Sequence, residues 1–275
     1  IGETVEKIVK EGIGKIVVSG GDGFVSLFMN RFFAVRRAMG KMNFSPHVLF
    51  LAGGTGNAIS YCHGFKNAWD AIGDFFSGRY TTERMGVLKV INGKKEELTH
   101  FLSFGADGEI IKIYNSQKLK GFIGYIMAVL RYAFSRRLYN IFSRNDANYD
   151  LEIKRDGETV HTGRHEGGGI STIPFIGYGF KPYPLARNGK AHIRFVLYGA
   201  LLMPTVFNLT KWVFLNRPNR IIYDRLVSSN SVLDFIFDRE LHVQIAGELQ
   251  EKRSSVRVDY SQERFIELVK KPAPA

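Results

Sequence analysis

The chain has 275 residues, of which 45% are hydrophobic and 23% are charged, proportions that are typical of a globular protein and exclude a disordered one. Its 38 Lys and Arg against 26 Asp and Glu leave a net charge of +12, which favours an anionic partner such as a membrane surface or a phosphorylated ligand. The basic residues are scattered without a nucleic-acid-binding motif, so we expect no nucleic acid partner. The single cysteine, Cys62, cannot form an internal disulfide, which fits a reducing, cytoplasmic location.

Two apolar stretches are too short to cross a membrane. Residues 121–134 are interrupted by Arg131, and residues 195–207 contain Pro204, whereas a spanning helix needs roughly 20 apolar residues. The first fifteen residues mix Glu, Lys and Gly and lack the apolar core of a secretory signal. We therefore expect a protein that is soluble or peripheral to a membrane.

The N-terminal region begins with a strand, a glycine turn and a helix. Residues 15–19 form a short β-branched run that stops at the glycines of residues 20–23. Residues 24–37 then carry apolar side chains at helical spacing, which predicts a helix with a broad buried face.

The same pattern follows a second time. Residues 47–51 form an apolar strand that runs into the glycine-rich residues 53–57. We expect a helix directly after this turn and a further helix over residues 69–76. Continuous apolar strands that alternate with helices predict a parallel sheet covered on both faces.

Short runs of alternating polarity begin near residue 82 and predict an antiparallel, β-rich domain. The runs cover residues 85–91, 99–104, 149–154, 191–196, 241–245 and 255–259. Asn92-Gly93 and Asp156-Gly157 separate them as hairpin turns do. We expect one inserted helical region over residues 112–142, and a helix or strand over residues 262–270 that returns to the first domain.

The two glycine turns are candidate anion sites. Each follows a predicted strand, and glycines let the backbone approach a phosphate group while a helix N-terminus offers free N–H groups. Neither turn has the Gly-Lys-Ser/Thr of a P-loop or the spacing of a dinucleotide-binding loop. Ordinary tight turns are the alternative, but an acid among the glycines, Asp22, suits phosphoryl transfer, where Mg²⁺ or a substrate hydroxyl lies between acid and phosphate.

Gly20-Gly21-Asp22-Gly23 followed by a helix is similar to the GGDGT signature of the diacylglycerol kinase catalytic domain family, which sphingosine, ceramide and bacterial lipid kinases share. Residues 54–58 resemble the second loop of that family, GTGN followed by Asp or Ala. Individually weaker similarities follow at residues 104–109, 119–125, 167–174 and 247–248.

The resemblance implies a fold class of α/β plus all-β. The nucleotide-binding α/β domain would cover residues 1–81, with residues 262–275 returning to it. An antiparallel β-sandwich that holds the acceptor would cover residues 82–261, and the active site would lie in the cleft between the domains. The implied activity is that of a lipid kinase at an anionic membrane surface, using ATP and Mg²⁺ to phosphorylate a diacylglycerol- or sphingoid-type hydroxyl.

The resemblance also assigns roles to residues. Asp22 would organise phosphate and Mg²⁺ or contact the acceptor hydroxyl, and Glu248 would be the general base that removes its proton. Asp107 and Glu109 would line the acceptor pocket, or lie as two acids in a solvent-facing turn. The nucleotide phosphates would be bound by Gly20, Gly21, Asp22, Gly23, Gly54, Thr55, Gly56 and Asn57. The resemblance identifies no further residue as a metal ligand.

The chain departs from the family pattern at three positions. Phe24 stands where the family has Thr, Asn188 where its Asp-Gly loop has Asp, and Ala246 where its terminal Asp-Gly-Glu has Asp. The upstream Asn-Pro-x-x-Gly strand of the family does not precede the first glycine turn in this sequence. A catalytically degenerate binding protein therefore stays an alternative, as does a kinase of a soluble substrate that resembles NAD kinases. A homodimer is also left open.

Two further segments carry hypotheses. Residues 121–137 have an apolar body that ends in Arg131, Arg136 and Arg137, and would rest on an anionic bilayer or form an ordinary core helix. His161 and His165 would align as a metal pair only on a helix, and Gly163 argues against one, so we expect no metal there.

Overall fold

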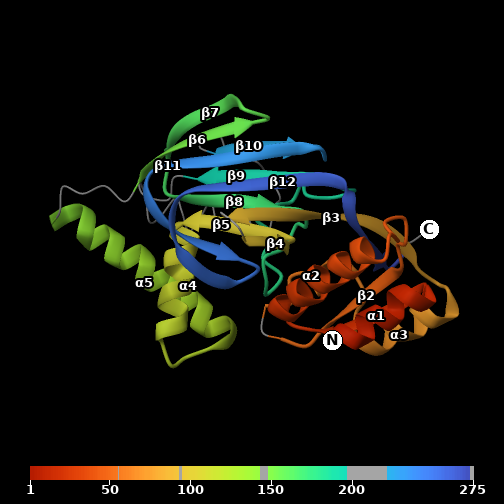
Figure 1. Ribbon diagram of the computed structural model, residues 1–275. Helices are drawn as coiled ribbons and strands as arrows, with labels where there is room; N and C mark the ends of the chain where they lie inside the picture. The colour runs from red at the N-terminus through yellow and green to blue at the C-terminus, as the bar shows by residue number, and fades with distance from the viewer. Residues whose placement is uncertain (55, 93–94, 143–147, 197–221, 273–275) are drawn as a thin grey trace.

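The structure is a computed structural model that describes residues 1–54, 56–92, 95–142, 148–196 and 222–272 (Figure 1). The helices are α1 (Gly2–Glu11), α2 (Asp22–Ala38), α3 (Ala68–Ser77), α4 (Ala106–Ser116) and α5 (Gly121–Phe142), with a 3₁₀ turn η1 (Ser60–Cys62). The strands are β1 (Lys15–Gly20), β2 (His47–Ala52), β3 (Thr81–Asn92), β4 (Lys95–Thr99), β5 (Phe101–Gly105), β6 (Tyr149–Arg155), β7 (Glu158–His165), β8 (Gly167–Ser171), β9 (Ala191–Val196), β10 (Ile222–Val227), β11 (Ser231–Ile245) and β12 (Glu248–Lys270).

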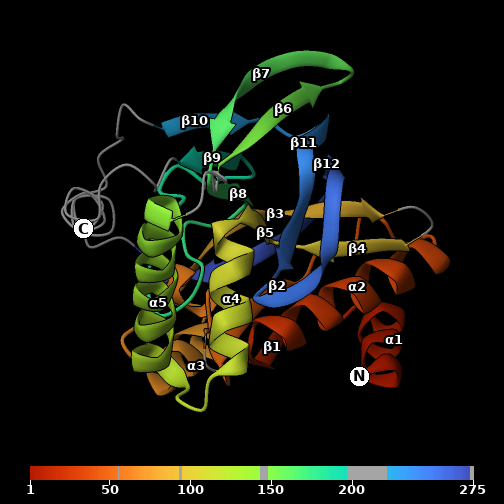
Figure 2. The same cartoon turned by 90° about the vertical axis from the view of Figure 1, so that its left-hand side faces the viewer.

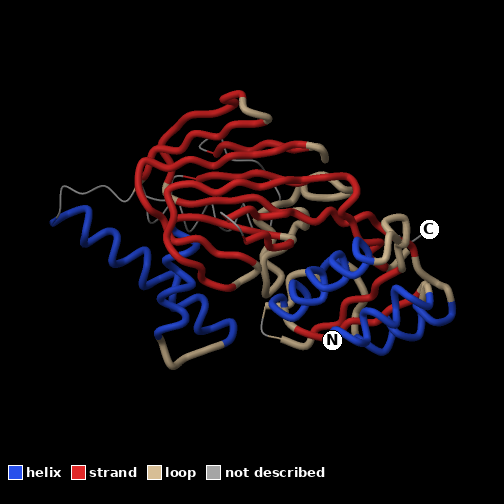
Figure 3. The backbone as a smooth tube through the Cα atoms, viewed as in Figure 1, coloured by secondary structure: helices blue, strands red, loops and turns tan. Residues whose placement is uncertain are grey.

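Within the described residues, the strands form one hydrogen-bonded sheet with the central order β1-β2-β12-β11-β5-β8-β9-β10. The helices gather in two separate groups, α1 to α3 beside the N-terminal strands and α4 with α5 beside the β-rich part (Figure 3). A parallel α/β part is thus joined to an antiparallel β-rich part, which confirms the predicted fold class.

The N-terminal part is built on two parallel strands. β1 pairs with β2 from Lys15 opposite His47 onward, and α1 and α2 cover one face with a core that includes Phe28 and Phe32. On the other face α3 packs Phe75 against β2. The apolar spacing that predicted α2 and α3 therefore reflects burial on opposite sides of one sheet.

The helix expected after the second glycine turn is wrong, because only the single 3₁₀ turn η1 forms there. The backbone is left-handed at Asn57, with φ 55°, and at Gly64, with φ 71°, which leaves too few residues between them for a stable helix. The inserted helical region begins at Ala106 rather than at residue 112. Helix α1 was not predicted at all.

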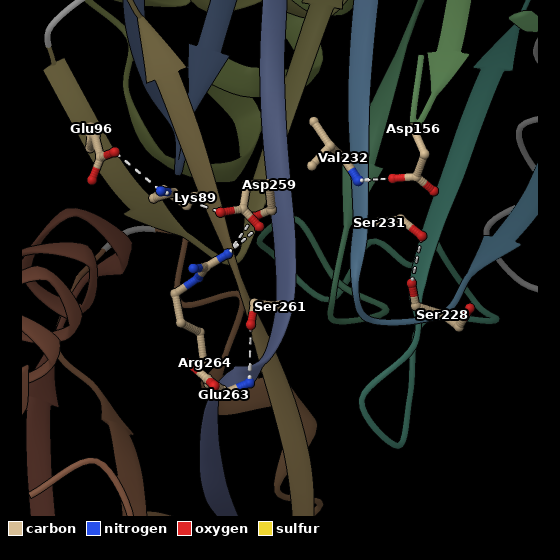
Figure 4. A network of polar contacts seen from close by, with 10 residues as sticks. All are labelled: Lys89, Glu96, Asp156, Ser228, Ser231, Val232, Asp259, Ser261, Glu263 and Arg264. Atoms are coloured by element: carbon tan, nitrogen blue, oxygen red, sulfur yellow. Dashed lines mark hydrogen bonds and ion pairs between the residues drawn. The ribbon is translucent and has the colours of Figure 1, made fainter. Parts of the chain in front are cut away.

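Two long strands, β3 and β12, run through both parts of the molecule. β12 pairs with β11, passes an irregularity between Tyr260 and Phe265, and ends parallel to β2 at Glu267 opposite His47. The end of β12 is therefore a strand that pairs with β2 in the N-terminal part. Near the irregularity Asp259 accepts ion pairs from Arg264 at 2.7 Å and Lys89 at 3.3 Å (Figure 4).

These ion pairs hold β12 where it changes partners. Burial raises the pKa of Asp259, but the hydrogen bonds and charges of Arg264 and Lys89 outweigh burial and leave that pKa below its ordinary value. Lys89 also pairs with Glu96 of β4 at 3.1 Å. The cluster thus ties β3, β4 and β12 together beside the boundary between the two parts.

The β-rich part is organised around aromatic side chains. Phe104 lies 5.0 Å from Phe237 and 5.2 Å from Phe235 between ring centroids, and it stacks on Phe195. The predicted hairpin turn at Asp156 and Gly157 is present, with φ of 54° and 89°. Helix α4 starts directly after β5, and α5 packs beside α4 at the outside of the molecule (Figure 2). No helix in the described part of the chain is long and apolar enough to span a membrane.

Candidate active site

The first glycine turn joins β1 to the N-terminus of α2. Gly21 caps the helix with an extended backbone, and Asp22 is its first residue. A Cβ atom on Gly20 would lie 2.5 Å from the ring of Phe24, so this ring folds back over the turn and leaves no space for a side chain. The aromatic side chain of Phe24, which is 44% exposed, therefore covers the turn at the position where the family has Thr.

The two glycine turns lie in direct backbone contact. A Cβ on Gly54 would be 2.5 Å from the Cα of Gly21, and one on Gly53 would be 2.8 Å from the backbone N of Gly20. The N–H of Gly53 donates to the carbonyl of Gly20 at 3.3 Å. Glycine is thus required at these positions for the packing of the two turns, in addition to any approach of a phosphate.

Asn57 uses its side chain to close the second turn. Its Oδ1 accepts the N–H of Gly54 at 2.8 Å and of Gly53 at 3.2 Å, and its Nδ2 donates to the carbonyl of Gly54. Asn57 therefore shapes the turn, while its predicted contact with nucleotide phosphate stays a prediction. Thr55 lies outside the described residues.

Asp22 connects the first turn to the second. Its Oδ1 accepts the N–H of Ala58 at 2.8 Å and the carboxyl also accepts the N–H of Ile59. Its other oxygen, Oδ2, would lie 2.6 Å from a Cβ on Gly56. Burial raises the pKa of Asp22 to about 6, although the two N–H groups oppose the rise. The carboxyl thus satisfies the two backbone N–H groups that follow the second glycine turn.

Glu248 reaches the first turn of α2 from the other part of the molecule. A Cβ on Gly23 would lie 2.6 Å from Glu248 Oε1, so the carboxylate rests against the helix N-terminus. Burial raises the pKa of Glu97 on β4, and the charge of Glu248 raises it further, whereas Arg253 lowers it. The charge of Glu248 therefore reaches a second acid, Glu97, which sequence reasoning had not identified.

The two acids predicted for the acceptor pocket, Asp107 and Glu109, point to different sides of α4, and their role in that pocket stays a prediction. Both lie in the first turn of α4. Residues two positions apart on a helix differ in direction by about 200°, so the two side chains point to different sides. Burial raises the pKa of Asp107 to about 7, opposed by a hydrogen bond with Ser103, and burial followed by the charge of Asp107 raises the pKa of Tyr125. Glu109 faces β11, with its Oε1 3.6 Å from Nε2 of His242.

The family positions that have lost an acid are turn residues in this chain. Asn188 has φ 51° and donates its N–H to Oε1 of Glu83 at 2.9 Å. Ala246 and Gly247, with φ of 48° and 88°, form the two-residue turn between β11 and β12. Both positions thus adopt a left-handed turn backbone in this chain without a carboxylate.

The described residues fit nucleotide phosphates and a divalent cation. Asp22 lies at the first glycine turn with a raised pKa that a cation would relieve, and Glu248 rests against Gly23 of the same turn. Mg²⁺ is commonly held by one or two carboxylates together with phosphate oxygens. No group of three His, Cys, Asp or Glu side chains in the described part is placed to hold a metal ion, so phosphate oxygens would complete the ligands.

Comparison with known proteins bears on the segment that carries both glycine turns. Residues 1–89 match the family model of the diacylglycerol kinase catalytic domain. This match confirms the resemblance predicted from the sequence. No curated protein matches the chain.

Solved structures of this type extend the likeness to the fold of the whole chain. A candidate diacylglycerol kinase from Bacillus anthracis str. Sterne has a TM-score of 0.66 at 17% identity, covering 100% of this chain and 84% of that one. A diacylglycerol kinase structure from the same organism has a TM-score of 0.62 at 14% identity, covering 99% and 82%. An NAD kinase from Archaeoglobus fulgidus in complex with ATP has a TM-score of 0.46 at 14% identity, covering 97% and 80%. The chain thus has the two-part fold of the diacylglycerol kinase structures.

The histidine pair behaves differently from the expectation. His161 and His165 lie on β7, not on a helix, yet their Nε2 atoms are 2.8 Å apart. Both rings lean over Gly163, where a Cβ would lie 3.1 Å and 3.2 Å from these two atoms, so the missing side chain lets them meet. The argument that only a helix could join them was wrong, because a strand with glycine between the two residues does so as well.

Proposed function

We propose that this chain transfers the γ-phosphoryl group of ATP to the hydroxyl group of a diacylglycerol- or sphingoid-type lipid. The observation that supports this most is the meeting of Asp22 and Glu248 at one helix N-terminus. Asp22 joins the two glycine turns, and Glu248 comes to Gly23 from the β-rich part. Phosphate positions and a base from the opposite side of the cleft are what transfer to an alcohol requires.

Each residue then has a defined task. The glycine turns and the N-terminus of α2 hold the nucleotide phosphates. Asp22, with Glu248 nearby, would hold Mg²⁺, which when bound would neutralise charge on those phosphates. Glu248 accepts the proton of the acceptor hydroxyl as the new phosphorus–oxygen bond forms and the bond to the leaving nucleotide breaks. Asp107, with a pKa of about 7, is suited to exchange hydrogen bonds with a polar head group.

The outer side of α5 supports action at a membrane surface. While Ala128 and Tyr132 face α4, the opposite side of α5 and the turn before it expose large apolar side chains, with exposed fractions from 39% to 66%. These side chains are Leu119, Phe122, Ile123, Met127, Leu130 and Phe134. Exposed Lys118, Lys120 and Arg131 accompany this apolar stripe. An apolar stripe with basic neighbours is the pattern of an interfacial helix on anionic lipid.

The surface hypothesis also rests on Arg136 and Arg137, whose side chains lie outside the described residues. Phe134→Glu should lower co-sedimentation with vesicles that contain anionic lipid by about tenfold. Phe76→Glu on α3 is the matched control, because Phe76 is 66% exposed and Phe134 is 64% exposed. Equal loss in both variants, or no loss in Phe134→Glu, would show that α5 does not rest on the bilayer.

Phosphate transfer from labelled ATP with Mg²⁺ tests the function. The acceptors are diacylglycerol, sphingosine and ceramide in mixed micelles, with NAD as the soluble alternative. Labelled lipid should form with wild type and fall by at least about a hundredfold in Asp22→Asn and Glu248→Gln. Glu251→Gln, an exposed Glu three residues along β12, should retain activity. Labelled NAD alone would favour the soluble-substrate kinase, and lipid binding without transfer would favour a degenerate relative.

A further inference from the structure

The loop over residues 172–190 connects β8 to β9 and lies against the second glycine turn. The N–H of Tyr178 donates to the carbonyl of Gly56 at 3.0 Å. The two backbones touch at the neighbouring residue as well, because a Cβ on Gly177 would lie 3.2 Å from the Cα of Gly56. The backbone of Tyr178 is therefore fixed directly beside the turn that we assign to nucleotide phosphate.

The ring of Tyr178 extends from this turn to the helices of the acceptor side. Its ring centroid lies 5.7 Å from that of Phe122 and 5.9 Å from that of Tyr125, both on α5. Its hydroxyl is 3.4 Å from the hydroxyl of Tyr114 on α4. Next to it, Phe180 stacks on Phe122 with centroids 5.8 Å apart. These aromatic side chains form a wall from the second glycine turn to the exposed apolar stripe of α5.

The backbone of Tyr178 is strained, which sets it apart from its neighbours. Its φ of 50° lies in the left-handed region, which a bulky aromatic residue rarely adopts, whereas Gly177 and Gly179 on either side accept positive φ without cost. A glycine would be easier to accommodate at position 178 as well. Strain of this kind is kept where a side chain has a task, and the surrounding contacts of Tyr178 hold it in place.

We propose that Tyr178 selects the acceptor, an inference that rests on the lipid kinase function proposed above. Its ring forms the wall between the phosphate turn and α5, so it limits the bulk of the unit that carries the reacting hydroxyl. The apolar chains of the acceptor lie along Phe122 and Phe180 toward the stripe on α5. The site therefore takes an amphiphilic alcohol whose hydroxyl stands on a small unit, and it disfavours a bulky polar group beside that hydroxyl.

Two substitutions separate the ring from its hydroxyl and from the backbone. Tyr178→Gly removes the ring but accepts the left-handed backbone, so its hydrogen bond to Gly56 and its folding are retained. Tyr178→Phe keeps the ring contacts with Phe122 and Tyr125 and removes only the hydroxyl. The assay measures kcat/KM for dioctanoylglycerol and for C8-ceramide, which carries a bulkier amide beside its hydroxyl, together with KM for ATP and the melting temperature.

Tyr178→Gly should change the ratio of the two kcat/KM values by about tenfold in favour of the bulkier acceptor, because the ring no longer limits the bulk of the unit that carries the hydroxyl. KM for ATP should stay within about twofold, and Tyr178→Phe should keep the wild-type ratio. An unchanged ratio in Tyr178→Gly, with wild type active, overturns the role of Tyr178 alone. A parallel fall for both acceptors shows a structural role and overturns it equally. Wild type that phosphorylates no lipid overturns the function itself, and the selection with it.

Discussion

Replacing Asp22 by Asn should stabilise the fold while it abolishes transfer. Burial raises the pKa of Asp22 from 3.8 to about 6, so the folded state binds this proton more tightly than the unfolded state. The stability that the protonated acid contributes is full below about pH 4 and is lost as the pH rises to about 6. At pH 7 the charged carboxyl costs about 3 kcal/mol, whereas Asn carries no charge and its oxygen still accepts the N–H of Ala58.

Urea denaturation at pH 5 and pH 7 measures this difference. From the two pKa values, Asp22→Asn should raise the free energy of unfolding by about 2 kcal/mol at pH 5 and about 3 kcal/mol at pH 7. The gain should thus grow by about 1 kcal/mol over this interval. Asp150→Asn at an exposed position on β6 is the control, because it measures how much an Asp-to-Asn exchange without burial changes the free energy of unfolding. A gain that is equal at both pH values, or a loss at both, would refute the reasoning.

Three further predictions test the packing of the fold and the site. Gly73→Ala, at an exposed position inside α3 with no atom within 4 Å of the added Cβ, should raise the melting temperature by about 2–4 °C, and a decrease would contradict the helix. Gly56→Ala places a Cβ 2.6 Å from Oδ2 of Asp22, so nucleotide affinity by calorimetry should fall at least about tenfold; unchanged affinity would remove this turn from the nucleotide site. Arg194→Met removes a buried guanidinium that bonds Asp224 at 2.8 Å and the carbonyl of Pro182 at 2.5 Å, and should cost about 3–5 kcal/mol of unfolding free energy by urea denaturation; a cost below about 1 kcal/mol would refute its anchoring role.

The elements that the sequence predicted well are those whose cause lies within a short stretch of chain. Apolar residues at strand or helix spacing give β1, α2, β2 and α3 because each buries that pattern on one sheet. The helix expected after Asn57 fails because the left-handed backbone at Asn57 and Gly64 leaves too few residues between them. The carboxyl of Asp22 takes the N–H groups of Ala58 and Ile59, a contact over 36 residues that a local pattern does not carry.

The candidate site divides in the same way. Asp22 was predicted because an acid among glycines has few ordinary explanations, and Glu248 through the resemblance to the family's terminal Asp-Gly-Glu; the roles of both stay predictions. Glu97 follows Lys94, Lys95 and Glu96 and resembles a solvated run of charges, so only the folded structure reveals that the charge of Glu248 reaches it. The role of Tyr178 likewise depends on a loop that folds across to Gly56.

The two lost acids illustrate how backbone and chemistry separate. Asp and Asn are favoured at left-handed turn positions for conformational reasons, apart from any charge they bring. Asn188 keeps that conformation with an amide, and Ala246 keeps it at φ 48° while its N–H donates to the carbonyl of Phe101 at 3.1 Å. Because both turns survive without a carboxylate, their family acids are not needed for folding. The fold at these positions depends on the left-handed backbone, whereas the chemistry proposed for the site depends on the acids that remain, Asp22 and Glu248.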